Sequence, residues 1–589
     1  MSAELYKLIF LILFFIFFFL CFSTSLFVKN IKKGFLIKIS LLCLGFFVIF
    51  YIRSIVYGDS IFASFDESNY KNILYRFVDG KESVISGPGY VYLLSFINYI
   101  TKINFSKLIP AIPFITAPLS MLMIYFLFRS ELKNKNTSFL ACILLLINSF
   151  FIWTINENRP EQLGILLFTI SAFLFYKYIS RSKHLALFLL FYSITFIYHF
   201  LSFLMLFGAC FFVIYWKYLK KEAGSLKKMI ILLVPSICFL FLFTTPWFLY
   251  SGMYRGMMFA SLLNYPLCLI NVNYILSIFF TIAIIIFIII TPILRAFISK
   301  VGVKKITKIL TRPFFIAITI LSIIFVVFLQ YKLISNVLFS LYLNSLPYFF
   351  FFSLGNISFG ILFLVGFFKL LKSHEKYLEY SIFLQYSFSL MLIGPIAIIS
   401  SILLPSSFNG MLTRVLDYWA IFASPIALIP ILSVSSIKNS YKFLLGGFVA
   451  FLMLLSLISA SKDPRLFNYG LYWTKTDVST MRWLCDQEGI FYIKNSKDFE
   501  GTLSKNQNYY MLMEMLIYKE HIQCKINLAS KSAIKNYEKN IVYNNEDIVV
   551  YKIIPSGDQS IPEKSFFTVP EGYVPSESGR MNKDIRCLH

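Results

Sequence analysis

The chain has 589 residues, of which 58% are hydrophobic and 14% charged, and its mean hydropathy is +0.74. This composition excludes an ordinary soluble protein, because a soluble domain with so much apolar sequence would aggregate. The formal net charge is +25. Most lysines and arginines lie in short loops between apolar stretches, so the charge indicates orientation in a membrane rather than binding of nucleic acid.

Apolar stretches near the bilayer length of roughly 20 residues recur from Leu8 to about Ala460. We therefore expect a mainly α, polytopic helical membrane protein with about 14 spans. The first stretch, from Leu5 to Phe27, lacks a small-residue cleavage site and exceeds a usual signal-peptide core, so we expect it to remain as a span.

The loop at residues 29–38 carries four lysines and is expected in the cytoplasm. This places the N-terminus outside, together with the polar stretch 57–92 that follows the second span. Later basic loops then fall on the inside by parity: 129–135, 181–183, 217–228, 295–312, 369–376 and 438–442. The sequence thus predicts a multi-pass protein of the plasma membrane.

Two choices underlie this parity. Residues 90–100 are expected to form a short helix at the membrane interface, since they are too few to span. Residues 184–216 are expected to form two short crossings that meet near His199. A single tilted helix there is the alternative, and it would reverse the orientation of everything downstream.

From Ser461 the composition becomes that of a soluble protein, and parity places this part outside. Its pattern predicts a small α/β domain, because an alternating sequence at residues 541–553 surrounds an Asn-Asn-Glu-Asp turn typical of a hairpin. The other expected elements are helices at 476–486 and 509–520 and a strand at 489–494. We divide the chain into a transmembrane module at 1–460, an extracytoplasmic domain at 461–555 and a flexible polar tail at 556–589.

Two of the nine cysteines, Cys485 and Cys524, lie on or beside the expected helices of this external domain and are candidates for one disulfide. The cysteines show no spacing typical of a zinc site, and the chain contains no Asp-x-Asp motif. We therefore expect no cofactor and no obligatory metal ion.

An acidic pair, Asp66 and Glu67, lies in the stretch 57–92, close to where apolar sequence ends. A carboxylate at the boundary between water and membrane can act as a general base on an acceptor hydroxyl, or can orient it. The alternative is a solvated loop acid. We take both residues as catalytic candidates and the stretch as a catalytic outer loop.

A second constellation runs from Asn156 to Gly164, at an expected outward junction between spans. Helix-start chemistry accounts for Asn158 as a cap, for Pro160 in the first turn, and in part for Glu161 beside the positive end of the helix dipole. It leaves Glu157 and Arg159 unexplained, and charges so close to hydrocarbon are costly unless they are used or paired. We predict Glu157 and Glu161 as catalytic and Arg159 as substrate-binding.

Three further substrate-binding candidates are His199, Arg414 and Asp417. His199 lies among aromatic residues, so it is either a packed interfacial residue or part of the site. Arg414 and Asp417 are three residues apart and share a helical face at the outer start of a late span. They either pair with each other, or Arg414 binds a phosphate in a groove of low dielectric. Parity places all these residues on one side of the membrane.

With these residues in view, the chain resembles the GT-C superfamily of membrane glycosyltransferases, which includes protein O-mannosyltransferases and the aminoarabinose transferases that act on lipid A. The resemblance rests on Asp66-Glu67 in the first outer loop, Gly87-Pro88-Gly89-Tyr90 before the next helices, the acids from Glu157 to Glu161, the late outward Arg414, and an external tail containing Met481-Arg482-Trp483-Leu484. Ser86-Gly87-Pro88 departs from the family's frequent His-Pro-Pro, and the Trp-Trp-Asp-x-Gly motif of oligosaccharyltransferases is absent.

The resemblance implies a polyprenyl-phosphate sugar as donor, with Asp66 as the base or orienting residue and Arg414 on the donor phosphate. The acceptor, a lipid, glycan or protein, stays open, as does the sugar. Two other functions are retained. A polysaccharide polymerase or ligase also uses lipid-linked sugars but depends on a large late external loop, and a transporter would need charged residues and broken helices near mid-membrane.

The predicted topology is testable with single cysteines placed at Ser83 and Ser556 after replacement of the native external cysteines. An impermeant thiol reagent should label both in intact cells, because both positions are expected outside. Labelling that requires cell lysis would show that the orientation is the reverse.

Overall fold

The fold was analysed in a computed structural model of the full chain. The described residues are 3–27, 34–56, 74, 77–78, 88–132, 134–156, 158, 160–181, 184–219, 222, 224–244, 346–372, 378–380, 382–387, 390, 409–435, 439–461, 480, 483–484, 487, 489–495, 526–529, 538–544, 548–554 and 566–567.

Within these ranges eight helices are long and apolar enough to cross a membrane: Leu8–Phe27, Gly34–Ile55, Lys107–Glu131, Pro160–Ile179, Ser202–Leu219, Leu354–Lys372, Asp417–Val434 and Ser440–Ala460. Two shorter apolar helices occupy Lys135–Ile147 and Leu185–Tyr198. The expected class, a mainly α protein with many apolar helices, is confirmed. The expected total of about 14 spans also involves residues 245–345, which lie outside the described ranges.

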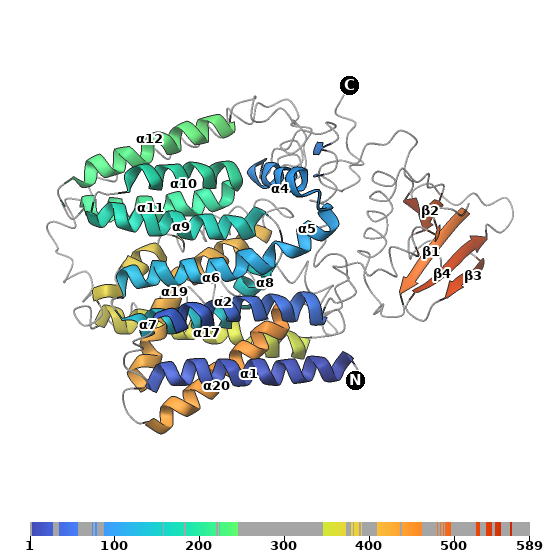
Figure 1. Ribbon diagram of the computed structural model, residues 1–589, viewed down its shortest axis with the longest axis horizontal. Helices are drawn as coiled ribbons and strands as arrows, with labels where there is room; N and C mark the ends of the chain where they lie inside the picture. The colour runs from blue at the N-terminus through green and yellow to red at the C-terminus, as the bar shows by residue number, and fades with distance from the viewer. Residues whose placement is uncertain are drawn as a thin grey trace.

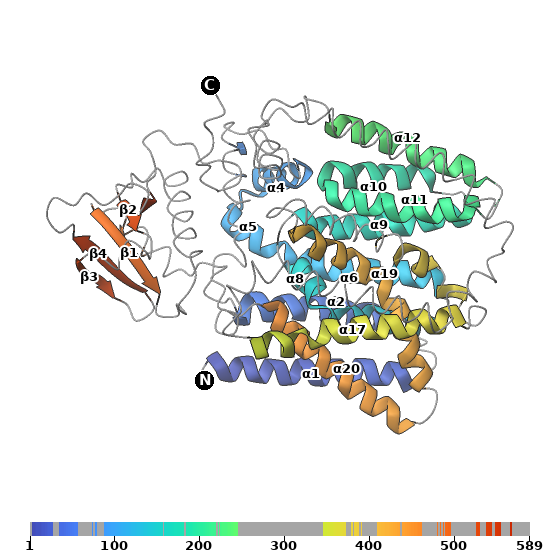
Figure 2. The same ribbon diagram turned by 180° about the vertical axis from the view of Figure 1, so that it is seen from behind.

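The helices form one body in which their long axes lie side by side (Figure 1). Their bounds are α1 Ala3–Phe27, α2 Gly34–Phe50 with the π-helical turn η1 Tyr51–Val56, α4 Pro88–Thr101, α5 Phe105–Ala111, α6 Pro113–Glu131, α7 Lys135–Leu144 with η2 Leu145–Ile147, α8 Ser149–Asn156, α9 Pro160–Arg181, α10 Leu185–Tyr198, α11 Phe200–Leu219, α12 Ser225–Thr244, α17 Leu346–Lys372, η5 Leu378–Tyr380, α19 Asn409–Ser435 and α20 Asn439–Ser461. The helices α1 and α20 pack on each other although more than 400 residues separate them (Figure 2).

Phenylalanine spacing explains how α1 packs. Phe10, Phe14, Phe18 and Phe22 recur every four residues, and their rings stack in succession with centroids 6.1–6.4 Å apart. Because residues four apart share a helical face, the repeat makes one aromatic stripe. Phe18 and Phe22 are fully buried in the core, so the stripe faces the other helices.

Glycines allow helices to approach closely, as is usual for helix interfaces in membranes. A Cβ atom at Gly45 of α2 would lie 2.8 Å from the Cα atom of Pro118 in α6. One at Gly366 of α17 would overlap the carbonyl oxygen of Ile426 in α19. Both helix pairs are in extensive contact, so these two glycines set how near the backbones lie.

The predicted helix break at His199 is confirmed. α10 ends at Tyr198 and α11 begins at Phe200, while His199 between them has extended backbone angles (φ −154°, ψ 107°). The two helices pack on each other and on α9. The short helix expected at 90–100 is also present, as α4; its depth relative to a bilayer stays a prediction.

Among the described residues near the C-terminus, five strands form one sheet in the order β3-β4-β1-β2-β5. The strands are β1 Gly489–Asn495, β2 Ile526–Ala529, β3 Glu538–Asn544, β4 Ile548–Ile554 and β5 Phe566–Phe567. β1 and β2 are parallel and every other pair is antiparallel. The expected strand and hairpin are therefore present as β1 and β3–β4. β5 continues the sheet past residue 555, where we expected the domain to end.

Most of the two helices expected in this part of the chain, together with Cys485 and Cys524, lies outside the described residues. The sheet lies beyond one end of the helical body in both views (Figures 1 and 2). The extracytoplasmic placement of the domain and the proposed disulfide stay predictions.

Two glycines of the same helix give a matched test of the close approach between α17 and α19. Gly366→Ala should lower the thermal stability of the detergent-solubilised protein, since the added methyl meets the backbone of Ile426. Gly360→Ala should be neutral or stabilising by up to about 1 kcal/mol, because nothing lies within 4 Å of a Cβ there and alanine favours helix. Melting followed by size-exclusion chromatography would compare them, and equal melting temperatures would contradict the packing.

Candidate functional site

Residues near both ends of the first predicted outer loop donate hydrogen bonds to the junction between α8 and α9, residues 156–160. Arg53, in the turn η1 that precedes this loop, donates from Nε to the carbonyl oxygen of Asn156 at 3.1 Å, and its Nη2 contacts the same oxygen. Tyr90 lies near the end of the predicted loop 57–92, in the helix α4 that begins at Pro88, and its hydroxyl donates to the carbonyl oxygen of Asn158 at 3.1 Å. Hydrogen bonds thus connect Arg53, just before the predicted loop 57–92, and Tyr90, near its end, to one junction.

Side-chain amides brace the same junction. Asn158 donates from Nδ2 to the carbonyl oxygen of Ile109 at 2.6 Å, and Gln162 donates from Nε2 to that of Ile155 at 2.6 Å. Both amide side chains are fully buried. α9 begins at Pro160, as helix-start chemistry predicts for proline. The residue directly before α9 is thus Arg159, and the expected cap Asn158 instead links the junction to α5.

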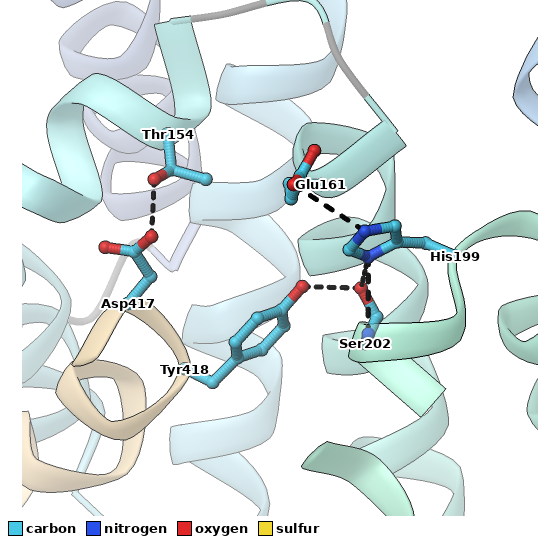
Figure 3. Close-up of polar contacts among 6 residues, drawn as sticks. All are labelled: Thr154, Glu161, His199, Ser202, Asp417 and Tyr418. Carbon is cyan, nitrogen blue, oxygen red and sulfur yellow. Dashed lines mark hydrogen bonds and ion pairs between the residues drawn. The ribbon is translucent and has the colours of Figure 1, made fainter. Parts of the chain in front are cut away.

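Glu161 and His199 meet inside the bundle. The His199 Nε2 atom lies 3.7 Å from Glu161 Oε1, and the two residues are only 7% and 4% exposed. Glu161 lies in the first turn of α9, whereas His199 occupies the break between α10 and α11. The acid and the histidine that sequence analysis selected separately therefore form one buried contact (Figure 3).

Beyond His199 the polar contacts continue to α19. His199 Nδ1 lies 2.6 Å from Ser202 Oγ, and the Ser202 amide donates to the same nitrogen at 3.3 Å. Ser202 Oγ also makes a short hydrogen bond with the Tyr418 hydroxyl. Ser202 and Tyr418 are almost completely buried. We call Glu161, His199, Ser202 and Tyr418 the buried relay (Figure 3).

Gly164 makes room for this relay. It lies three residues after Glu161 and thus near the same face of α9. A Cβ atom at this position would collide with Ser202 Oγ and lie 3.1 Å from His199 Nδ1. Only glycine lets α9 come this close to the α10–α11 break, which explains the last residue of the Asn156–Gly164 constellation.

Asp417 is held by a different neighbour. Its Oδ2 atom accepts a hydrogen bond of 2.6 Å from Thr154 Oγ1 of α8, and the residue is 3% exposed. Asp417 and Tyr418 are consecutive in α19, yet one contacts α8 and the other contacts α11 (Figure 3). This part of α19 therefore connects the α8 side of the site with the buried relay.

The predicted site residues differ in how far the structure describes them. Glu161, His199 and Asp417 are fully described and buried. Arg414 lies in α19, but only its helical backbone is described, so a pair between Arg414 and Asp417 stays a prediction. The remaining four, Asp66, Glu67, Glu157 and Arg159, lie outside the described residues.

Sequence reasoning missed Arg53, Tyr90, Thr154, Ser202 and Tyr418 as parts of the site. Ser202 lies only three residues after the candidate His199, but His-x-x-Ser does not match the capping box of Ser or Thr followed by Glu or Gln. The contacts of the other four cross more than 60 residues of sequence. No local pattern reports contacts over such separations.

An acid, a histidine and a serine in hydrogen-bond succession can activate a serine nucleophile. Here Ser202 Oγ is enclosed by His199, Tyr418 and Gly164, and its residue is fully buried, so no substrate carbonyl can reach it. The arrangement instead suits proton handling or electrostatic support by Glu161. No cluster of three or more His, Cys, Asp or Glu with metal-binding potential occurs among the described residues; the expectation of no metal stays a prediction.

These observations define the class of the protein: it is a multi-span helical membrane protein, with buried ionisable residues at helix junctions. Such residues are costly in a membrane, which makes these junctions a candidate functional site. No family model and no curated protein matches the chain. The resemblance to GT-C glycosyltransferases therefore stays a hypothesis.

Thr154 offers a test of the buried contact with Asp417. Thr154→Val keeps the side-chain shape but removes the hydroxyl donor, and it should destabilise the protein by about 1–3 kcal/mol, the cost of a lost hydrogen bond to a buried group. Thr154→Ser keeps the hydroxyl and should lose less stability. A valine variant that melts no lower than the serine variant would contradict this role for the hydroxyl.

Proposed function

We propose that the protein is an integral membrane glycosyltransferase of the GT-C type, which moves a sugar from a polyprenyl-phosphate donor to an acceptor on the outer face of the plasma membrane. The observation that carries the proposal is that both flanks of the first outer loop bond to the α8–α9 junction. Asp66 and Glu67 lie in that loop, and Glu161 directly follows the junction, in the first turn of α9. In the proposed enzyme, these hydrogen bonds bring the two acidic constellations to one end of the bundle.

Sugar transfer from such a donor needs a base for the acceptor hydroxyl and positive charge for the departing phosphate. In the proposed mechanism Asp66 takes or orients the acceptor proton, as the acceptor oxygen bonds to the anomeric carbon and the bond to the lipid phosphate breaks. Arg414 binds the donor phosphate, where a fixed guanidinium stabilises the charge that develops.

The remaining predicted residues complete the acceptor and donor sides. Glu161 and Glu157 assist the acceptor. The other three residues bind substrate or hold the residues that bind it: Arg159, His199 and Asp417. The burial of Glu161 and His199 supports this assignment, because electrostatic contacts are strongest where water is excluded. In this proposal the polyprenyl chain of the donor lies among membrane lipids, the acceptor is a lipid, glycan or protein, and the N-terminus and the C-terminal sheet are outside.

A multi-span transporter is the second candidate. The helix break at His199 favours it, since a broken helix beside buried ionisable groups is a common feature of transport pathways. A transporter would carry its substrate without forming or breaking a glycosidic bond, so product analysis separates the two functions.

The proposed transfer can be tested with purified protein in nanodiscs and a labelled polyprenyl-phosphate sugar. Asp66→Asn should lower turnover by about 10²–10⁴-fold while leaving donor binding nearly unchanged, because only the base is lost. Arg414→Ala should weaken donor binding first. Glu161→Gln should also impair turnover, whereas Glu222→Gln should not, since Glu222 is an exposed residue paired with Lys217 in the α11–α12 connection.

Native mass spectrometry of the same preparation gives an independent reading. A co-purifying polyprenyl phosphate is expected in the wild type and should be depleted in Arg414→Ala. Near-normal turnover of Asp66→Asn would move the base to Glu157 or Glu161. Binding without any sugar transfer would favour the transporter.

A further inference from the structure

The buried relay has a direction that its geometry fixes. The Ser202 backbone N–H can only donate, and it points to His199 Nδ1 at 3.3 Å. Nδ1 must therefore be the unprotonated nitrogen of the ring. The single imidazole proton is then on Nε2, the atom that faces Glu161.

Helix capping is the physical reason for this state. His199 is extended and directly precedes α11, so it is the N-cap residue of that helix, and Ser202 is its third residue. An N-cap side chain satisfies an orphan N–H of the first turn by accepting a hydrogen bond. Protonation of Nδ1 would place two donors against each other at the start of a buried helix.

The two hydroxyls then order themselves. With Nδ1 as acceptor, Ser202 Oγ–H donates to it across 2.6 Å, and shares the nitrogen with the Ser202 amide. Ser202 Oγ is left to accept from the Tyr418 hydroxyl. Each hydrogen-bond donor of the buried relay thus points from α19 through α11 toward Glu161 in α9.

We propose that Tyr418 and Ser202 are positioning residues for Glu161, acting through a neutral His199 that they hold with its Nε2–H aimed at the Glu161 carboxylate. The separation of 3.7 Å exceeds a normal hydrogen bond, and contacts of this kind shorten when substrate binds. The helix that carries Arg414 thereby orients an acid on the opposite side of the site. The effect on turnover rests on the function proposed above, whereas the protonation state of His199 does not.

Nitrogen-15 NMR of the full-length protein tests the proposal, because the two ring nitrogens give distinct signals when only one is protonated. The chain has five histidines, so a variant with only His199 simplifies the spectrum. In that variant His374, His521 and His589 become Gln, and His184, whose φ is +67°, becomes Asn, which tolerates this conformation. The expected result is a neutral ring with its proton on Nε2.

Matched variants test the two hydroxyls. Ser202→Ala should shift the Nδ1 signal but leave the proton on Nε2, because the backbone N–H of residue 202 still donates to Nδ1. Tyr418→Phe should also shift the Nδ1 signal, through Ser202. The controls are Ser424→Ala, a buried serine of α19 bonded to Ala141, and Tyr386→Phe, a buried tyrosine stacked on Phe422 of the same helix. Both controls should leave the His199 signals unchanged, since neither residue belongs to the buried relay.

Two spectra would overturn the proposal: a His199 ring protonated on Nδ1 or on both nitrogens, or signals that do not respond to either Ser202→Ala or Tyr418→Phe. In the sugar-transfer assay Tyr418→Phe should lower kcat by about tenfold, the upper value for one hydrogen bond, and leave the donor KM unchanged. Absence of any sugar transfer, with the expected spectra, would reject the glycosyltransferase and leave the His199 state established. Transfer with kcat unaffected by Tyr418→Phe would reject the positioning role alone.

Discussion

The contact between Glu161 and His199 depends on taking two ionisable side chains out of water within an apolar bundle. Such burial costs free energy unless each group finds polar partners. The partners come from three helices and one helix break: Glu161 on α9, His199 between α10 and α11, Ser202 on α11 and Tyr418 on α19. Gly164 is the steric condition, because any side chain there would push α9 away from His199.

The same requirement shapes the neighbouring α8–α9 junction. Its carbonyl groups at Asn156 and Asn158 accept from Arg53 and Tyr90, so the bonding capacity left where α8 ends is used by the flanks of the first outer loop. Arg53 and Tyr90, at the two ends of the loop that carries Asp66, are thus held by main-chain carbonyl groups of the junction. In the proposed enzyme, catalysis by Asp66 depends on the same hydrogen bonds that stabilise the α8–α9 junction.

α19 joins these two regions. Asp417 accepts from Thr154 of α8, while the next residue, Tyr418, reaches Ser202 of α11. Consecutive helical residues point about 100° apart, so one turn of α19 can serve two helices. Arg414 lies one turn earlier on the same helix. In the proposed enzyme this arrangement couples the donor phosphate site to the acid on the acceptor side.

The sequence by itself determined the class of protein, the helix break at His199, the start of α9 at Pro160, and the strands β1, β3 and β4. These follow from local properties: apolar run length, proline at a helix start, and alternation about a turn. Tertiary structure decided which residues share a site, since the contacts of Arg53 with Asn156 and of Ser202 with Tyr418 join residues 103 and 216 apart. Local pattern ranks Glu161 and His199 as separate candidates, and only the packing of α9 against the α10–α11 break, with glycine at position 164, brings them together.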